Sequence, residues 1–292
     1  MTASKILRMP IPNLEQRRKA EAFRALHSGS DPLLLPNVWD VASARIVEEA
    51  GFPALATTSA GIAFTLGYPD GQRIHADRMM AAVARIAQAV RIPVSADVES
   101  GYGNDPERVA RMARAVIMAG AVGLNLEDAT GDPEQPLLDL SLQVEKIHAI
   151  RSLANKLDVP LVINARTDVY LLQVGEPSSR YDETIRRLSA YRDAGADCVF
   201  VPGLGDLTTI KRLVAEVSCP VNILAGPGSP PISELRSAGV ARVSLGSGPM
   251  RAALGTLRRI AEELKTSGTY ALLADAPTHS EMNKLMRTET EN

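Results

Sequence analysis

Short apolar runs alternate with longer amphipathic segments along most of the chain. The runs are five or six residues long and rich in apolar and β-branched side chains, which is typical of buried strands. They are Leu33–Asn37, Ala54–Ser59, Pro93–Val98, Val122–Glu127, Leu161–Arg166, Cys198–Pro202, Val221–Gly226 and Arg242–Ser247. The pattern therefore predicts eight strands.

The segments between these runs have helical periodicity. After the first run, Val41, Ala44 and Val47 recur at helical spacing, and Gly51 follows as a helix-ending glycine. Pro106 begins another such segment, at the first-turn position where proline is tolerated. Several segments end in Ala-Gly just before the next run, as αβ connections do. We therefore expect a parallel α/β architecture.

An eightfold repeat favours a (β/α)₈ TIM-type barrel over an open doubly wound sheet. A dinucleotide-binding sheet needs a G-x-G-x-x-G turn between a strand and a helix, and neither Gly101-Tyr102-Gly103 nor Gly226–Pro230 has that spacing. We predict one domain over residues 1–292, with the barrel at about 33–266. A helix at about 13–27 should cover its bottom, and a helical tail at about 269–292 should follow.

Polar residues interrupt the apolar pattern where the predicted strands end. Because parallel barrel strands end at one face, these side chains should meet there, where the active sites of such barrels lie. They are Asp97, Glu99, Glu127, Asp128, Arg166 and Asp168; in addition, the second run leads on through a longer segment to Asp70, and the seventh run carries Asn222 within it.

Crowded carboxylates repel one another unless a cation or a base stands among them. Mg²⁺ or Mn²⁺ would resolve this repulsion, and Mg²⁺ usually takes one or two protein carboxylates and keeps several waters. Asp97 is the candidate direct ligand, while Asp70, Glu99 and Glu127 are expected to reach the ion through water. The alternative is that these acids are helix caps and solvated loop charges.

Arg166 and Glu127 are the candidate catalytic residues. The Arg166 guanidinium could clamp a substrate carboxylate or serve only as a structural ion pair with the acids. Thr58, Ser59 and Ala60 lie in a small-residue turn after the second run, where backbone N–H groups can hold an anionic oxygen.

Composition excludes several other classes. The net charge of −2 and 4% aromatic residues give no broad basic surface or stacking platform for nucleic acid. No apolar stretch has the length of a membrane span or of a signal-peptide core, so we expect a cytoplasmic protein. Cys198 and Cys219 border apolar runs, where a free thiol behaves as a small hydrophobe, and the four histidines have no zinc-ligand spacing.

Five motifs in one order carry a resemblance to a known family. They are NVWD (37–40), TTSAGIAFTLGYPDG (57–71), ADVESGYGN (96–104), GLNLED (123–128) and NARTD (164–168). Together they closely resemble the isocitrate lyase/phosphoenolpyruvate mutase superfamily, over roughly residues 33–251.

The resemblance implies a Mg²⁺-dependent barrel that stabilises a pyruvate-type enolate of a 2-oxo acid. It implies that Asp97 binds the metal with support from Asp70, Glu99 and Glu127. It also implies that Arg166, Asn222 and Arg251 contact the substrate, and that the backbone of Thr58–Ala60 holds a carboxylate. The terminal helix, within Tyr270–Arg287, is expected to pack on a neighbouring subunit in a homodimer or homotetramer; the alternative is that it folds back on its own barrel.

The sequence also departs from that family. The segment after Glu127 reads DATGDPEQPLLD and lacks the K-K/R-C-G-H motif of the lyases and the lysine and asparagine of the mutases. A carbon–carbon lyase or decarboxylase acting on a small 2-oxo or 2-hydroxy dicarboxylic acid is the leading hypothesis, because decarboxylation forms an enolate without a protein base. The alternatives are a phosphonopyruvate-type C–P hydrolase or mutase and a catalytically weak 2-oxo acid binding protein.

Overall fold

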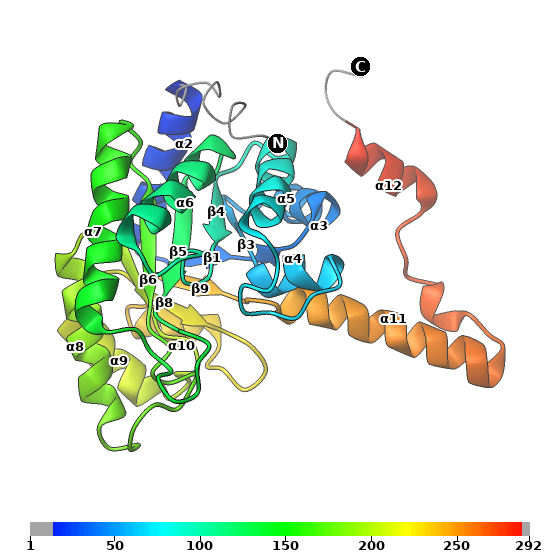
Figure 1. The fold of residues 1–292 in the computed structure, drawn as a ribbon. Coiled ribbons are helices and arrows are strands. Elements are labelled where there is room, and N and C mark those ends of the chain that lie inside the picture. The colour runs from blue at the N-terminus through cyan, green and yellow to red at the C-terminus, as the bar shows by residue number, and fades with distance from the viewer. Residues whose placement is uncertain (1–13, 288–292) are drawn as a thin grey trace.

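Parallel strands surrounded by helices form the body of the molecule (Figure 1). The computed structural model describes residues 14–287. The strands are β1 (Leu33–Leu35), β2 (Asn37–Val38), β3 (Leu55–Thr57), β4 (Val94–Asp97), β5 (Gly123–Glu127), β6 (Val162–Arg166), β7 (Cys198–Phe200), β8 (Val221–Leu224) and β9 (Arg242–Ser244). Their order is β1-β9-β8-β7-β6-β5-β4-β3-β2, and every neighbouring pair is parallel. The predicted TIM-type barrel is confirmed.

The first predicted strand is divided in two. Pro36 has no N–H to give to a sheet, and the chain on its two sides pairs with different neighbours, β1 with β9 and β2 with β3. The Asn37 side chain bridges this seam: its Nδ2 donates to the Thr57 carbonyl at 2.9 Å, and its Oδ1 accepts from the N–H groups of Leu245 and Gly246, both at 2.8 Å. The barrel therefore closes through a broken strand and one amide side chain.

The helices lie outside the strands, and all but the last two, which are largely exposed, bury part of one face. They are α2 (Leu14–Ala25), α3 (Val41–Glu49), α4 (Ser59–Thr65), α5 (Ala76–Ala89), α6 (Pro106–Met118), α7 (Leu140–Lys156), α8 (Arg180–Asp193), α9 (Leu207–Val217), α10 (Ile232–Ser237), α11 (Gly248–Ser267) and α12 (His279–Met286). In α6, Pro106 stands in the first turn, and Val109, Met112 and Val116 form its buried face. The core fills the space between these faces and the strands.

The N-terminal helix covers the bottom of the barrel, as predicted. The fully buried ring of Phe23 occupies the space that a side chain at Gly123 would take: a Cβ there would lie 2.7 Å from its Cε1. The ring also meets His27 edge to face, with centroids 4.9 Å apart. The predicted start of this helix at residue 13 lies outside the described residues.

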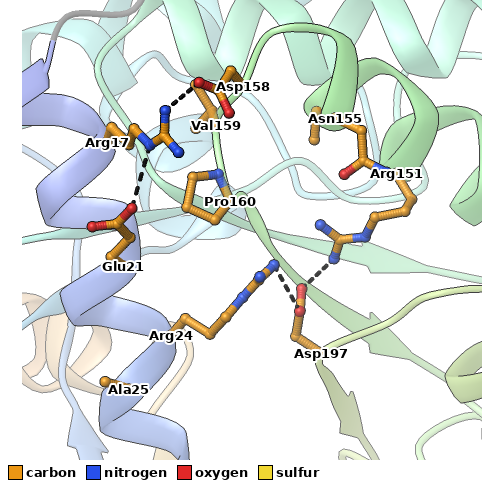
Figure 2. Close-up of a pocket in the computed structure, with 11 residues that line it drawn as sticks. Arg17, Glu21, Arg24, Ala25, Arg151, Asn155, Asp158, Val159, Pro160 and Asp197 are labelled. Atoms are coloured by element: carbon orange, nitrogen blue, oxygen red, sulfur yellow. Dashed lines mark hydrogen bonds and ion pairs between the residues drawn. The ribbon is translucent and has the colours of Figure 1, made fainter.

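A surface hollow of about 680 Å³ lies beside this helix (Figure 2). Arg24 and Arg151 converge on Asp197 from opposite sides, and Arg17 joins Glu21 and Asp158. Ion pairs thus engage the charged side chains at this end, which is opposite to the end where barrel active sites assemble. We interpret the hollow as the edge of a group of ion pairs that hold α2 in place.

The C-terminal extension leaves the barrel. Helix α11 runs away from the strands, and α12 returns toward α3 (Figure 1), where Arg45 Nη1 donates to the carbonyls of Leu285 and Arg287. Thr278 and Glu281 form a capping box at the start of α12. Residues 288–292 of the predicted tail lie outside the described residues. Within residues 14–287, no helix combines the length and apolar character needed to cross a bilayer.

Candidate active site

Three neighbouring strands bring charged side chains to the mouth of the barrel. Asp97 ends β4, Glu127 ends β5 and Arg166 ends β6, and Glu127 lies directly beside Arg166 in the sheet register. Side chains alternate along a strand, so these residues share the interior face with Asn125 and Asn164 one step below. The sequence-predicted acids and base therefore meet at one end of the barrel.

Asp97 is the most firmly held of these acids. Its Oδ2 accepts hydrogen bonds from the backbone N–H of Ser59 at 3.0 Å and from Ser59 Oγ at 2.9 Å. Its own N–H donates to Thr57 Oγ1 at 2.9 Å. The other oxygen, Oδ1, is buried and has no hydrogen-bond partner among residues 14–287. One carboxylate oxygen is thus fixed by the protein while the other is left without a donor.

Asp70 stands next to this pair on the loop after α4. Ser59 Oγ lies 3.5 Å from Asp70 Oδ1, at the limit of a hydrogen bond. Burial raises the pKa of Asp70, and the charge of Asp97 raises it further. Asp70, from the loop after α4, and Asp97, at the end of β4, therefore both lie within reach of the Ser59 hydroxyl.

Glu99 sits in a strained turn just beyond β4. Its φ is +53°, in the left-handed region that few non-glycine residues adopt. Gln72 donates its backbone N–H to Oε2, and the Tyr102 hydroxyl donates to Oε1 at 3.2 Å. Burial, followed by the charges of Asp97 and Asp70, raises the pKa of Glu99 to about 7. The turn thus holds this carboxyl beside the other acids despite their repulsion.

Arg166 lies between two carboxylates. Its Nη1 is 2.8 Å from Glu127 Oε2, and its Nε donates to Asp168 Oδ1 at 2.7 Å. The guanidinium carbon also lies 5.7 Å from the centre of the Phe200 ring. Burial raises the pKa of Glu127 well above its usual range, and the positive charge of Arg166 opposes this rise.

Asp128 has a structural environment rather than a place at the mouth. It is fully buried and accepts hydrogen bonds from Thr167 Oγ1 at 2.7 Å, the Asp168 N–H at 2.9 Å and the Tyr191 hydroxyl at 2.6 Å. Arg187 neutralises it at 3.1 Å. Asp128 therefore ties the end of β5 to the loop that carries Asp168.

The residues expected to contact substrate fall into two groups. Thr58 caps α4, and Ser59 and Ala60 form its first turn beside Asp97, so these three lie at the mouth. Asn222 is fully buried on β8, where its Nδ2 donates to Ser244 Oγ at 3.1 Å and its Oδ1 has no partner. Arg251 is exposed near the start of α11, and within the described residues no hydrogen bond or ion pair joins it to the acids.

A polar layer forms the floor beneath these charges. Asn125 Oδ1 accepts from Asn164 Nδ2 at 2.7 Å and from Arg242 Nη2 at 3.2 Å. Burial lowers the pKa of Arg242 to about 10. The site is therefore closed from below by hydrogen-bonded side chains rather than by an apolar plug.

Two site residues escape sequence reasoning. Gln72 and Tyr102 hold the Glu99 carboxyl, yet neither ends a strand or interrupts an apolar pattern. Both have a positive φ, +56° in each case. The available signal is a neighbouring glycine, Gly71 or Gly101, that marks a turn without saying which side chain the turn presents.

The donor set fits a hard divalent cation. Every candidate ligand is a carboxylate oxygen, the kind that Mg²⁺ and Mn²⁺ prefer, and the Oδ1 of Asp97 could serve as one ligand. Among residues 14–287, no group of three acidic, histidine or cysteine side chains could hold one ion directly.

Comparison with known proteins places the chain. The phosphoenolpyruvate phosphomutase family profile matches residues 23–265. A solved structure from Burkholderia cenocepacia, described provisionally as a lyase/mutase, superposes with a TM-score of 0.89 at 41% identity, covering 95% of this chain and 98% of that one.

Relatives with named activities are more distant. Oxaloacetate decarboxylase of Rhodopseudomonas palustris is 32% identical over 74% of this chain and 72% of its own, and 2-methylisocitrate lyase of Escherichia coli is 28% identical over 87% of each. The structure of oxaloacetate acetylhydrolase with its product oxalate has a TM-score of 0.82 at 27% identity, covering 92% of this chain and 93% of that one. The chain therefore belongs to the phosphoenolpyruvate phosphomutase family and is an enzyme of the isocitrate lyase/phosphoenolpyruvate mutase superfamily.

Proposed function

We propose that the protein is a Mg²⁺- or Mn²⁺-dependent carbon–carbon lyase or decarboxylase that acts on a small 2-oxo or 2-hydroxy dicarboxylic acid. The observation that carries this proposal is the buried, partnerless Oδ1 of Asp97, set among acids with Arg166 opposite them. A buried carboxylate oxygen without a donor is costly, and a cation relieves that cost.

The acids would divide the work of holding the ion. Asp97 would bind it directly, and Asp70, Glu99 and Glu127 would accept hydrogen bonds from its waters. When bound, the cation supplies Lewis acidity that stabilises negative charge developing on a 2-oxo acid. The Ser59 hydrogen bonds keep the second oxygen of Asp97 turned away, which leaves Oδ1 for this role.

Arg166 would orient the substrate carboxylate. Glu127 and Asp168 engage its Nη1 and Nε, so among the described contacts Nη2 is the nitrogen left for a substrate. A bidentate grip through Nε and Nη2 would require Arg166 to give up Asp168. Thr58–Ala60 would offer backbone N–H groups to a second anionic oxygen, and Asn222 and Arg251 would contact more distant parts of the substrate.

Decarboxylation fits the groups that this chain carries. Loss of CO₂ leaves an enolate without removal of a proton by the protein, and residues 128–139 contain no cysteine, histidine or lysine that could serve as a base. Two of the relatives act on oxaloacetate by name, a decarboxylase and an acetylhydrolase. An oxaloacetate-like diacid is therefore the first substrate to test.

A basic surface beside the mouth also favours an anionic substrate. A hollow of about 580 Å³ is lined by Arg73, Arg78 and Arg108 and has no carboxylate side chain in its wall. Gln72 and Tyr102, which hold Glu99, form part of the same wall. Positive charge at this position would attract diacids toward the mouth.

The test is a panel of 2-oxo and 2-hydroxy diacids, assayed for pyruvate and CO₂ with Mn²⁺ and after chelation. We expect metal-dependent turnover of at least one C4 or longer diacid. Release of phosphate from phosphonopyruvate, with no reaction of the diacids, would instead establish the C–P chemistry that the family profile also allows. Absence of turnover across both panels would leave the binding-protein alternative.

Oxalate provides a second, independent measurement. It resembles a planar, doubly charged pyruvate enolate, so it should bind more tightly than pyruvate and only with the cation present. Arg166→Lys should weaken this binding by about 1.5–3 kcal/mol, the range for hydrogen bonds to charged groups. Failure of oxalate to bind in the presence of Mg²⁺ would exclude the enolate mechanism.

A further inference from the structure

Lys146 is a buried cation outside the cluster just described. It lies on the inner face of α7, its side chain is fully buried, and its Nζ donates to the backbone carbonyl of Ser100 at 3.2 Å. No acidic side chain in residues 14–287 lies within ion-pair distance of it, and burial alone lowers its pKa to about 8. The Lys146 ammonium therefore has a backbone carbonyl, and not a carboxylate, as its partner among the described residues.

The Ser100 carbonyl belongs to the most contorted segment at the mouth. Glu99, Gly101 and Tyr102 all have positive φ, at +53°, +92° and +56°. A Cβ at Gly101 would lie 2.9 Å from Val109, so this turn is pressed against α6. Left-handed non-glycine residues persist only where their surroundings hold them.

Two side chains hold this turn from opposite sides. Gln72 donates from its backbone to Glu99 and from its side-chain amide to Ser100 Oγ, on the mouth side. Lys146 reaches the Ser100 carbonyl from the side of α7. Ser100 is therefore held at its hydroxyl by the Gln72 amide and at its carbonyl by the Lys146 ammonium.

Packing alone does not account for a lysine at this position. Burying an ammonium without a counter-ion is costly, and an apolar side chain of similar volume usually packs there at no loss of stability. Ile147 and Ile150, on the same buried face of α7, show what that packing would look like. The N–H donor is the property that an apolar residue could not supply.

We propose that Lys146 is a positioning residue that fixes the left-handed turn at Glu99 and thereby the direction of the Glu99 carboxyl. The proposal rests on the proposed function only in taking Glu99 as a support of the cation. Lys146 itself touches neither the ion nor the substrate. Its effect on the site is carried by the single peptide between Ser100 and Gly101.

Hydrogen exchange in the metal-free protein tests the turn directly. Two backbone amides report on the turn. The Gly101 N–H donates to the backbone carbonyl of Val98 at 2.9 Å, and the Glu127 N–H donates to the backbone carbonyl of Glu99 at 3.0 Å. Lys146→Met should make both exchange about tenfold faster or more, because local opening becomes easier. Lys146→Arg, which keeps a donor, should retain part of the protection.

Arg151→Met is the matched control. Arg151 lies on the same helix and also donates to backbone carbonyls, those of Leu161 and Gly195, but at the opposite end of the barrel, where it forms an ion pair with Asp197 as well. It should lower the melting temperature without changing exchange at Gly101 or Glu127. Equal effects of the two variants on these amides would show that Lys146 is merely a stabilising residue and would overturn the proposal.

Mn²⁺ titration of the same variants gives the second readout. Loss of a group that orients a metal's surroundings typically weakens binding 10–100-fold, and we expect about that for Lys146→Met, little change for Arg151→Met, and partial recovery for Lys146→Arg. Lys146→Gln replaces Lys146→Met if the latter does not fold. Unchanged Mn²⁺ affinity together with unchanged exchange at the turn would refute the positioning role.

The two measurements separate the two claims. If the wild-type protein binds no Mn²⁺ while exchange at the turn still depends on Lys146, the proposed cation site is wrong and the positioning of Glu99 stands. If the wild-type protein binds Mn²⁺ but substitution of Lys146 changes neither hydrogen exchange at the turn nor the Mn²⁺ affinity, the cation site stands and the positioning role of Lys146 is wrong.

Discussion

At the scale of single residues, the two carboxylate oxygens of Asp97 have different hydrogen-bonding environments. Ser59 satisfies Oδ2 twice, while Oδ1 is buried without a donor. This asymmetry explains how a carboxylate can be both rigid and available. It also separates Asp97 from Asp128, whose two oxygens are satisfied by the protein.

Asp97→Ala should therefore abolish Mn²⁺ binding and turnover together. The loss of affinity should exceed the roughly 10–100-fold cost of removing an orienting group, because Asp97 is the proposed direct ligand. The fold should survive, since removal of one crowded carboxylate relieves repulsion, and Asp97→Asn should behave alike while keeping an acceptor for Ser59. Calorimetry showing wild-type Mn²⁺ affinity in either variant would remove Asp97 from the site.

Glu99 should make the stability of the metal-free protein depend on pH. Its folded pKa of about 7 lies above the ordinary value of 4.5, so the folded state keeps this proton to higher pH. The stabilisation is complete below pH 4.5 and is lost as the pH rises through 7, a change on the order of 3 kcal/mol. Urea unfolding from pH 4.5 to 8 should show this decline.

Glu99→Gln should flatten that decline, whereas substitution of the exposed Glu107 by glutamine should not. The raised pKa values of Asp70, Glu127 and Asp168 act in the same direction, so part of the slope should remain in Glu99→Gln. An unfolding free energy that rises between pH 4.5 and 7 in the metal-free wild type would contradict this assignment.

Residues at strand ends could be predicted, and residues in turns could not. Asp97, Glu127 and Arg166 follow buried strands, so the strand pattern alone placed them at one face. Gln72 and Lys146 act through backbone conformation and through contacts across 27 to 46 residues of sequence, which no local pattern encodes. The one local hint at Lys146 is a charge on a buried helix face whose other members are Gln143 and apolar residues.

At the scale of elements, most helices and strands lie where the hydrophobic periodicity predicts them. The exceptions arise from the chemistry of individual residues. Pro36 divided the first strand because it cannot donate to a ladder. Short helix α4 was read as a turn, and its cap at Thr58 is what sets Ser59 against Asp97. The eightfold pattern was sufficient to predict the barrel, but not the break in the first strand or the short helix after β3.

Helix α2 provides the element-scale prediction. Phe23→Ala should lower the free energy of unfolding by about 3–5 kcal/mol, because it leaves a cavity under Gly123 that the rigid strands cannot fill. Mn²⁺ affinity should not change, since the mouth lies at the other end of the strands. Chemical denaturation and metal titration of one sample measure both, and a stability loss below about 1 kcal/mol would mean that α2 does not close the core.

At the scale of the whole molecule, α11 is the element without enough contacts. Of its 20 residues only Met250 is buried, and Leu254, Leu257 and Leu264 are 45%, 60% and 59% exposed. A helix of this length with its apolar face in water is only marginally stable. We propose that it packs on a neighbouring subunit in a homodimer or homotetramer.

Light scattering should therefore find two or four times the chain mass of 31.2 kDa. Leu257→Arg should dissociate the assembly, while the control Glu262→Lys, also exposed on α11, should leave it intact. A wild-type mass near 31.2 kDa at micromolar concentration would rule out this assembly.

The Asn37 seam also determines when the barrel can be completed during protein synthesis. Asn37 bonds Leu245 and Gly246, which lie 208 and 209 residues further along the chain. Until those residues leave the ribosome, β1 lacks β9, and the growing sheet has two open edges that could pair with other chains. The first strand to be synthesised therefore cannot pair fully until the last strand is made. A chain that ends before Arg242 should consequently aggregate, because its sheet keeps two unpaired edges.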